Sequence, residues 1–437
     1  MVRYDSHRPF DAPERIAYVN ALFIIGTLGT LITPALLAAW AKLNWTQSQL
    51  GLAAAAELAT LTIGSLSGLY WQRRWNWRRV TLVALLVATL ANGVCMVSTD
   101  FVTVCVARGV VGLGGGLLCV VYSAFVANIH SPGRMIALTT FVQICVEAAM
   151  TYSTTSVFEW FGSAGLFAVM AVLLLLLVAP LRILPVGWPS EVSSAADPGS
   201  TEGSWRGYPL LLAFLPYVVV QAGVYTFLGE FGHLAAHLPL DQTLRAIAIS
   251  IVLSSLGSVA AYVLNDRGGL LLPISGAIAV MAGTVCTLIL GPHSLATFLV
   301  SISLLQIAWV FLNCYLYSAL IEANNLLVSA ATPMSSFGSA LGASAMGYAL
   351  ERGGLTGAFG LSVGALGLTA FLTIPFLKRR ALRCTFAEGV SARHRVLPLG
   401  CRCKDSSGSA VESFTDSSTK LERMSCTPGI RTRTVRA

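Results

Sequence analysis

Long apolar runs separated by short polar segments make up this chain from residue 16 to residue 377. A helix of about 20 residues crosses the ~30 Å hydrocarbon core of a bilayer, because it rises ~1.5 Å per residue. Twelve runs reach that length: 16–40, 48–71, 80–99, 101–128, 135–158, 164–184, 208–233, 244–264, 270–290, 295–321, 326–350 and 357–377. We expect all of them to be helices, since an open strand edge leaves backbone groups unpaired in lipid.

The longest gap between runs, residues 185–207, is rich in proline, glycine and serine and reads as a flexible cytoplasmic linker. It separates six runs at 16–184 from six at 208–377, which is typical of a duplicated architecture. The pattern therefore predicts an all-α membrane protein with two six-helix bundles. Residues 1–15 form a polar cytoplasmic lead, and residues 378–437 are expected to be a polar, disordered tail.

The composition excludes an ordinary soluble globular protein, because 55% of the residues are hydrophobic and only 11% are charged. If the N-terminus is cytoplasmic, the inner segments hold fifteen lysines and arginines and the outer loops hold three. This positive-inside bias predicts cytoplasmic termini in a cell membrane, with a bacterial inner membrane expected. It also accounts for the net charge of +8 without nucleic acid.

Three charged residues lie deep inside the runs: Glu57, Arg108 and Glu147. A charge at such depth is costly and usually faces another charge or a water-filled cavity. Counting residues along each helix places all three at a similar level, so we expect Arg108 to pair with Glu147 or Glu57. Two carboxylates beside one arginine leave one acid free to titrate, which is what proton coupling requires. The alternative is a static ion pair that only holds the helices together.

Other residues in the runs suggest packing faces and a cavity. Small residues at helical spacing allow close helix contact, and this predicts packing at Gly112, Gly114, Gly116, Gly338 and Gly342. Polar side chains in the runs are candidates for solute binding, with hydrogen bonding between helices as the alternative: Asn20, Gln143, Gln221, Tyr225, Gln306, Asn313 and Tyr315. The third, sixth, ninth and twelfth runs hold no interior charge, so the other eight are expected to surround a central cavity.

The motif R-x-x-x-G-x-G in the fourth run, at Arg108, Gly112 and Gly114, resembles the major facilitator superfamily of secondary transporters. The two sets of six runs and the basic loop between the second and third runs add to that resemblance. It implies a central cavity, with Arg108 linked to proton coupling. The acid of the family's inner-loop signature is missing here, with Gln72 nearest, and Glu147 stands where drug/proton antiporters carry a glycine-proline signature.

We therefore expect a monomeric carrier that moves a small organic solute across the bilayer, coupled to protons, by alternating access. The alternative is a receptor or sensor of the same shape that transports nothing. An enzyme is not expected, because we recognise no nucleophile–base pair, no cofactor motif and no C-x-x-C pair among the ten cysteines. No cofactor and no metal are expected.

Overall fold

The structure is a computed structural model of the 437-residue chain. It describes residues 12–126, 128–129, 132–186, 208–264, 270–290, 294–323 and 325–394. Most of the predicted N-terminal lead, most of the linker at 185–207 and residues 395–437 of the predicted tail lie outside the described residues. The residues before the linker are called the N-terminal half below, and residues 208–377 the C-terminal half.

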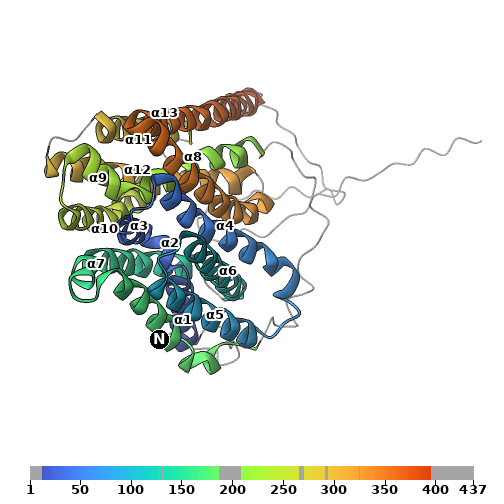
Figure 1. Cartoon of the computed structure of the whole chain (residues 1–437). Helices are drawn as coiled ribbons and strands as arrows, with labels where there is room; N and C mark the ends of the chain where they lie inside the picture. The colour runs from blue at the N-terminus through green and yellow to red at the C-terminus, as the bar shows by residue number, and fades with distance from the viewer. Residues whose placement is uncertain are drawn as a thin grey trace, which may run out of the picture. The chain divides into compact units, whose positions relative to one another are not determined.

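The described residues form helices throughout (Figure 1). The helices of the N-terminal half are α1 (Pro13–Gly26), α2 (Leu28–Leu31), α3 (Thr33–Ala41), α4 (Gln47–Trp71), α5 (Trp77–Val97), α6 (Phe101–Val126), α7 (Pro132–Leu176) and the 3₁₀ helix η1 (Ala179–Ile183). Those that follow the linker are α8 (Tyr208–Thr226), α9 (Leu228–Ala236), α10 (Leu240–Leu264), α11 (Leu271–Leu290), α12 (Leu295–Ala323) and α13 (Asn325–His394).

Within the described residues, nine helices are long and apolar enough to cross a membrane. Two of them, α7 and α13, each cover two predicted runs and have a non-helical residue between the two, Gly162 and Gly354. Both glycines have a positive φ, +64° and +55°, which a residue with a Cβ rarely adopts. The first predicted run is divided among α1, α2 and α3. The count of twelve spans thus stays a prediction.

The division of the first run has a local cause. Thr27 and Ile32 leave helical geometry, with ψ angles of 7° and 26°. Pro34 has no N–H group to continue the helix and stands in the first turn of α3, where proline is tolerated. The second half repeats the feature, because Phe227, with φ −100° and ψ 15°, separates α8 from α9. Interrupted helices at corresponding positions of two halves are typical of transporter binding sites.

The glycines of α6 bring three helices close to it. A Cβ on Gly112 would collide with the Glu57 carbonyl oxygen of α4, and one on Gly116 with the Leu61 carbonyl oxygen. A Cβ on Gly115 would lie 2.6 Å from the Gly26 carbonyl oxygen of α1, and one on Gly114 3.1 Å from the Ala84 carbonyl oxygen of α5. In the C-terminal half, Gly338 and Gly342 of α13 contact Val218 and Val219 of α8.

We expect Gly112→Ala to destabilise the protein by about 1–3 kcal/mol, because the methyl group forces α4 and α6 apart. Gly109→Ala is the matched control on the same helix, since its Cβ would make an ordinary 3.4 Å contact with Thr60 Cγ2. Thermal unfolding in detergent should separate the two variants. Equal melting temperatures would contradict the close approach at Gly112.

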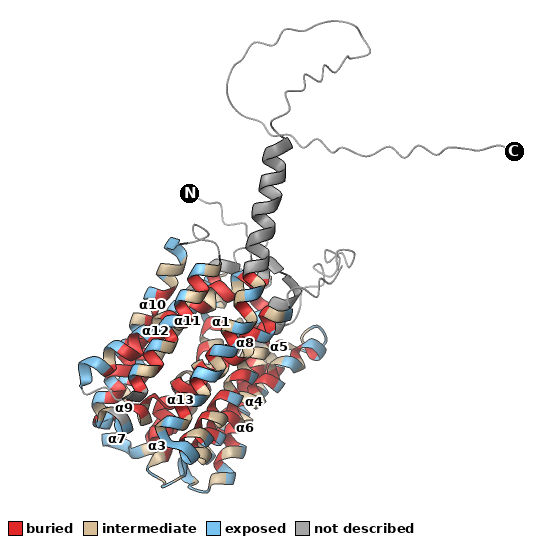
Figure 2. Cartoon of the chain, turned by 90° about the horizontal axis from the view of Figure 1, so that it is seen from above, coloured by how far each residue is buried: buried red, intermediate tan, exposed pale blue. Residues whose placement is uncertain are grey.

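Buried residues face neighbouring helices, and exposed residues lie on the outer faces (Figure 2). Many of the exposed residues are large and apolar. The helix α5 illustrates this division: Ala84, Ala88 and Asn92 are buried, whereas Leu90 is 71% exposed and Val97 83% exposed. Such apolar exposure is costly in water and suits lipid. The exposed side of α5 agrees with the expectation that the third run faces lipid.

The last helix differs from the sequence-based expectation. The last apolar run ends at residue 377, but α13 continues to His394, so the first part of the predicted disordered tail is helical. The chain divides into two compact units, Met1–Arg383 and Cys384–Ala437. Of the second unit the structure describes only the end of α13.

Candidate functional site

A buried ion pair joins α4 to α6. Arg108 Nη2 contacts Glu57 Oε2, and the Arg108 side chain is 0% exposed. Asn92 of α5 completes the site, because Arg108 Nη1 donates a hydrogen bond of 3.3 Å to Asn92 Oδ1. Asn92 is held in turn by its own hydrogen bond of 2.9 Å to the Ala88 carbonyl oxygen. Charge and hydrogen bonds together reduce the cost of burying this guanidinium group.

The short helix α2 covers the ion pair. A Cβ on Gly29 would collide with Arg108 Nη2 and with the Glu57 carboxylate. A residue without a side chain is therefore needed where α2 passes over the pair. Any larger residue at this position would have to displace α2 or the ion pair itself, so the interruption of the first run and the buried charges belong to one site.

Arg108 pairs with Glu57, one of the two acids expected for it, but Glu147 does not share the arginine, which corrects the expectation that two carboxylates lie beside it. Among the described residues the one ion pair is Arg108–Glu57. Glu147 of α7 instead lies 2.6 Å from Tyr225 Oη, measured from its Oε1 atom. The face of α7 that carries Glu147 turns toward α8.

Tyr225 also contacts the first run. Its hydroxyl donates a hydrogen bond of 2.6 Å to the Leu31 carbonyl oxygen at the end of α2. The same four-residue helix thus contacts the Arg108–Glu57 pair through Gly29 and Tyr225 through Leu31. Because Tyr225 belongs to the C-terminal half, this contact joins the two halves.

Further contacts between the halves lie near Gln47, where α4 begins; we call this the contact end. Gln47 Nε2 donates a hydrogen bond of 3.2 Å to Glu230 Oε2 of α9. The backbone N–H of Ser48 donates one of 2.9 Å to Glu351 Oε2 of α13. A Cβ on Gly51 would lie 2.5 Å from the Ala343 carbonyl oxygen, so the backbones of α4 and α13 touch there. The helices α7 and α10 also lie side by side across the halves (Figure 1).

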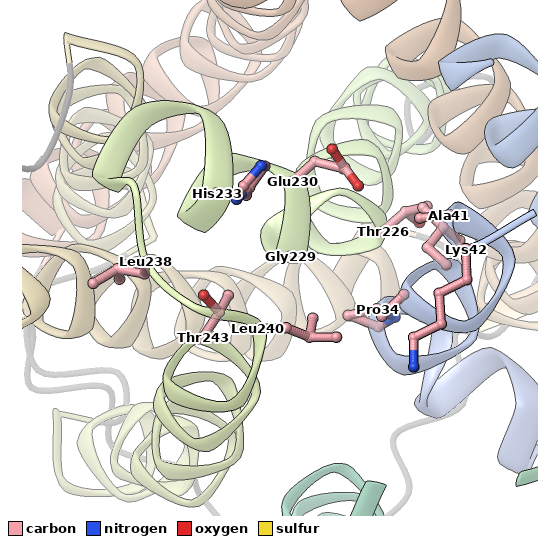
Figure 3. Close-up of a pocket in the computed structure, with 12 residues that line it drawn as sticks. Pro34, Ala41, Lys42, Thr226, Gly229, Glu230, His233, Leu238, Leu240 and Thr243 are labelled. Atoms are coloured by element: carbon pink, nitrogen blue, oxygen red, sulfur yellow. The ribbon is translucent and has the colours of Figure 1, made fainter. Parts of the chain in front are cut away.

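A pocket of about 260 Å³ lies at the contact end between α3, α9 and α10 (Figure 3). Glu230 and His233 line it from α9, and Lys42 lines it from the residue after α3. Drug-sized ligands usually occupy about 300–1,000 Å³, so this space is small for a solute site. Its mixed lining of three ionisable groups on an apolar wall suits a few water molecules.

The predicted solute-binding residues occupy different environments. Asn20 of α1 is buried against α6 and α7. Thr139 Oγ1 of α7 donates a hydrogen bond to Asn20 Oδ1 and accepts one from the hydroxyl of Tyr122 on α6. Gln143 and Gln221 are half-buried, each four residues before Glu147 or Tyr225 on the same helix. On α12, Gln306 and Tyr315 are buried and Asn313 is half-buried.

Several residues of this site were not predicted. Asn92 lies inside the third run, which was expected to face lipid because it holds no interior charge. Its isolation among apolar neighbours was the available signal. Gly29 and Leu31 gave no signal in the sequence, because neither residue has a polar side chain and Leu31 acts through its backbone carbonyl group. Glu351 stood at the boundary of a predicted loop, where an acid is ordinarily solvated.

Comparisons with known proteins agree on one family. The family model for the Major Facilitator Superfamily matches residues 19–327. A comparison with curated proteins returned no match.

Three solved structures share the fold. The crystal structure of a mutant of the nucleoside transporter NupG has a TM-score of 0.61 at 14% identity and covers 83% of this chain and 98% of its own. The POT family transporter PepTSo has a TM-score of 0.66 at 12% identity, over 86% and 99%. A D-xylose-proton symporter has a TM-score of 0.61 at 16% identity, over 83% and 95%.

Proposed function

Because this chain belongs to the Major Facilitator Superfamily, we propose that it is a secondary active transporter that couples a small organic solute to protons by alternating access. The chain is a multi-pass membrane protein. The proposal further holds that α7 and α13 each cross the bilayer twice, so that twelve spans form two six-helix bundles around a central cavity. Both termini are then cytoplasmic, and the contact end faces outward.

The repeated interruption of the first helix of each half supports this layout. Thr27 in the N-terminal half and Phe227 in the C-terminal half depart from helical geometry in the same way. Gly162 and Gly354 likewise stand at equivalent places, between the fifth and sixth spans of each half. Duplicated halves that carry the same irregularities are typical of secondary transporters.

The observation that carries the proposal is the contact of Glu147 with Tyr225. This contact places an acid on the boundary between the two halves. Within the described residues, no cation forms an ion pair with that acid. An acid there can gain or lose a proton as the halves separate. The Arg108–Glu57 pair lies one short helix away and provides the fixed charges of the same region.

The proposed solute site lies next to this contact, toward the cytoplasm. In a twelve-span layout α7 and α8 both begin at the cytoplasmic side, so Gln143 and Gln221 lie about 6 Å below Glu147 and Tyr225. Residues four apart share a helix face, so we propose that the two amides face a common space from opposite halves. Amides bind neutral groups through hydrogen bonds, which favours a solute with hydroxyl or amide groups. Transporters of nucleosides and of D-xylose are among the proteins of similar fold.

Direct transport assays test the function. The purified protein is screened by thermal shift against nucleosides, sugars and short peptides, and each stabilising compound is assayed in liposomes with and without an inward pH gradient. We expect at least one compound to accumulate only with the gradient. Stabilising compounds that never cross the bilayer would indicate the alternative, a receptor of the same fold.

Closing the contact end permanently should stop transport. In a cysteine-free background we expect a cleavable thiol cross-linker between Ser48→Cys and Glu351→Cys to lower flux by at least about tenfold, because alternating access requires this end to open. Reductive cleavage should restore the flux.

The matched control joins two residues within one half. Thr287 of α11 and Ser301 of α12 are 3.0 Å apart at their hydroxyl oxygens, so Thr287→Cys with Ser301→Cys forms a similar cross-link. That pair should carry normal flux. Full flux through the cross-linked Ser48/Glu351 pair would contradict alternating access at this end.

A further inference from the structure

The Tyr225 bridge consists of the Tyr225 hydroxyl, the Leu31 carbonyl oxygen and the Glu147 carboxyl group. We propose that this bridge holds Glu147 in its protonated form while the contact end is closed, and that loss of the proton releases Tyr225 from Leu31. Tyr225 is then the positioning residue through which protonation controls the contact between the halves. This inference rests on the function proposed above and names its proton switch.

The number of available protons supports the inference. Tyr225 Oη lies 2.6 Å from the Leu31 carbonyl oxygen and 2.6 Å from Glu147 Oε1. Oxygen atoms at this distance are joined by a proton, because the separation is at the short end of O–H···O hydrogen bonds. Tyrosine has one hydroxyl proton, and a backbone carbonyl has none. We therefore assign the second proton to Glu147, which then donates to Tyr225 Oη while Tyr225 donates to Leu31.

The interruption of the first run makes the Leu31 carbonyl group available. In an unbroken helix the N–H of Ala35 would bond to the Leu31 carbonyl oxygen, four residues earlier. Here the N–H of Ala35 bonds to the Ile32 carbonyl oxygen at 2.9 Å. A buried carbonyl group without a donor costs free energy, and the hydroxyl of Tyr225 removes that cost. Closure at this point thus depends on a donor from the other half.

No cation of the described residues forms an ion pair with Glu147. The buried Arg108 is engaged by Glu57 and Asn92. From α10, Arg245 lies over the ring of Tyr152, five residues further along α7. A bare carboxylate at this depth would be costly, whereas a neutral carboxylic acid needs only its hydrogen bonds.

Deprotonation changes the bridge in a defined way. The O–H bond of Glu147 breaks, the proton passes to water, and the carboxylate keeps the electron pair. The single hydroxyl proton of Tyr225 then turns to the carboxylate, the stronger acceptor, so Leu31 loses its donor. The first run is thereby detached from α8, and the link between the halves at this point falls from two hydrogen bonds to the one between Tyr225 and Glu147.

Infrared spectroscopy of the protein in liposomes tests the bridge without any solute. We expect a carboxylic-acid C=O band at neutral pH in the wild type that is absent in Glu147→Gln. In Tyr225→Phe, which keeps the ring and removes the hydroxyl group, the band should shift in frequency. The pH profile of solute exchange should also move by about one unit, the size of one hydrogen bond to a titrating group.

Tyr217→Phe is the matched control. Tyr217 lies on the same helix and its hydroxyl also donates to a backbone carbonyl, that of Trp309, at 2.8 Å but within the C-terminal half. Its variant should leave both the band and the pH profile unchanged. A wild type without the Glu147 band, or a Tyr225→Phe variant with an unshifted band, would overturn the inference, whereas proton-driven flux in the wild type would still support the proposed function.

Discussion

Arg108→Gln is expected to abolish transport and to lower the stability of the protein sharply. The substitution leaves Glu57 buried, at 4% exposure, without its cation. Breaking a buried ion pair by removing one partner costs about 3–5 kcal/mol, because the remaining charge is uncompensated. Transport should fail in addition, since the pair and the short helix α2 above it lie next to the Tyr225 bridge. Thermal unfolding in detergent and flux in liposomes measure the two effects separately.

The double variant Glu57→Gln with Arg108→Gln separates the two roles of the pair. Removing both charges leaves no buried charge unpaired, so we expect stability to recover substantially while flux remains absent. Recovery of both stability and flux would contradict a role in transport. The pair would then be the static lock that the sequence allowed as an alternative.

Glu147→Gln is expected to abolish proton-driven accumulation of the solute. A pH gradient of one unit is worth about 1.4 kcal/mol per proton, which corresponds to about tenfold accumulation of the solute. Glutamine occupies the same volume and can bond to Tyr225, but it cannot release a proton. The variant should therefore never accumulate solute above equilibrium, and it should exchange solute slowly, because the amide keeps the Tyr225 bridge intact.

Glu230→Gln is the control for that result. Glu230 is also an acid at the boundary of the halves, where it accepts a hydrogen bond from Gln47, but it lies in the pocket at the contact end and not in the Tyr225 bridge. We expect this variant to keep proton-driven accumulation. Loss of accumulation in Glu230→Gln together with normal accumulation in Glu147→Gln would move the proton site to the pocket.

Much of the fold followed from hydrophobic runs. The predicted run at 48–71 corresponds to α4 (Gln47–Trp71), and the run at 270–290 to α11 (Leu271–Leu290). The resemblance to the major facilitator superfamily is confirmed by the family match over residues 19–327. The breaks around α2 were not predicted, because hydropathy does not report backbone geometry. Three threonines and Pro34 in that run were visible signs, since such residues offer the backbone other partners.

The site was predicted only in part, for a geometric reason. Counting residues gives the depth of a side chain along its helix but not the direction in which it points. The residue count predicts similar depths for Glu57 and Glu147, yet one contacts Arg108 and the other contacts Tyr225. Tyr225 was expected to bind solute, and its contact with a backbone carbonyl of the other half has no signature in a sequence.

Proton movement that accompanies the solute tests the central claim most directly. Liposomes that enclose a pH indicator are prepared with the wild-type protein or with the Glu147→Gln variant. A solute identified by thermal shift is then added outside, with no pH gradient imposed. The account predicts that solute entry acidifies the interior of wild-type liposomes and leaves the interior of Glu147→Gln liposomes unchanged. Solute entry at a normal rate with no change of internal pH in the wild type would contradict it.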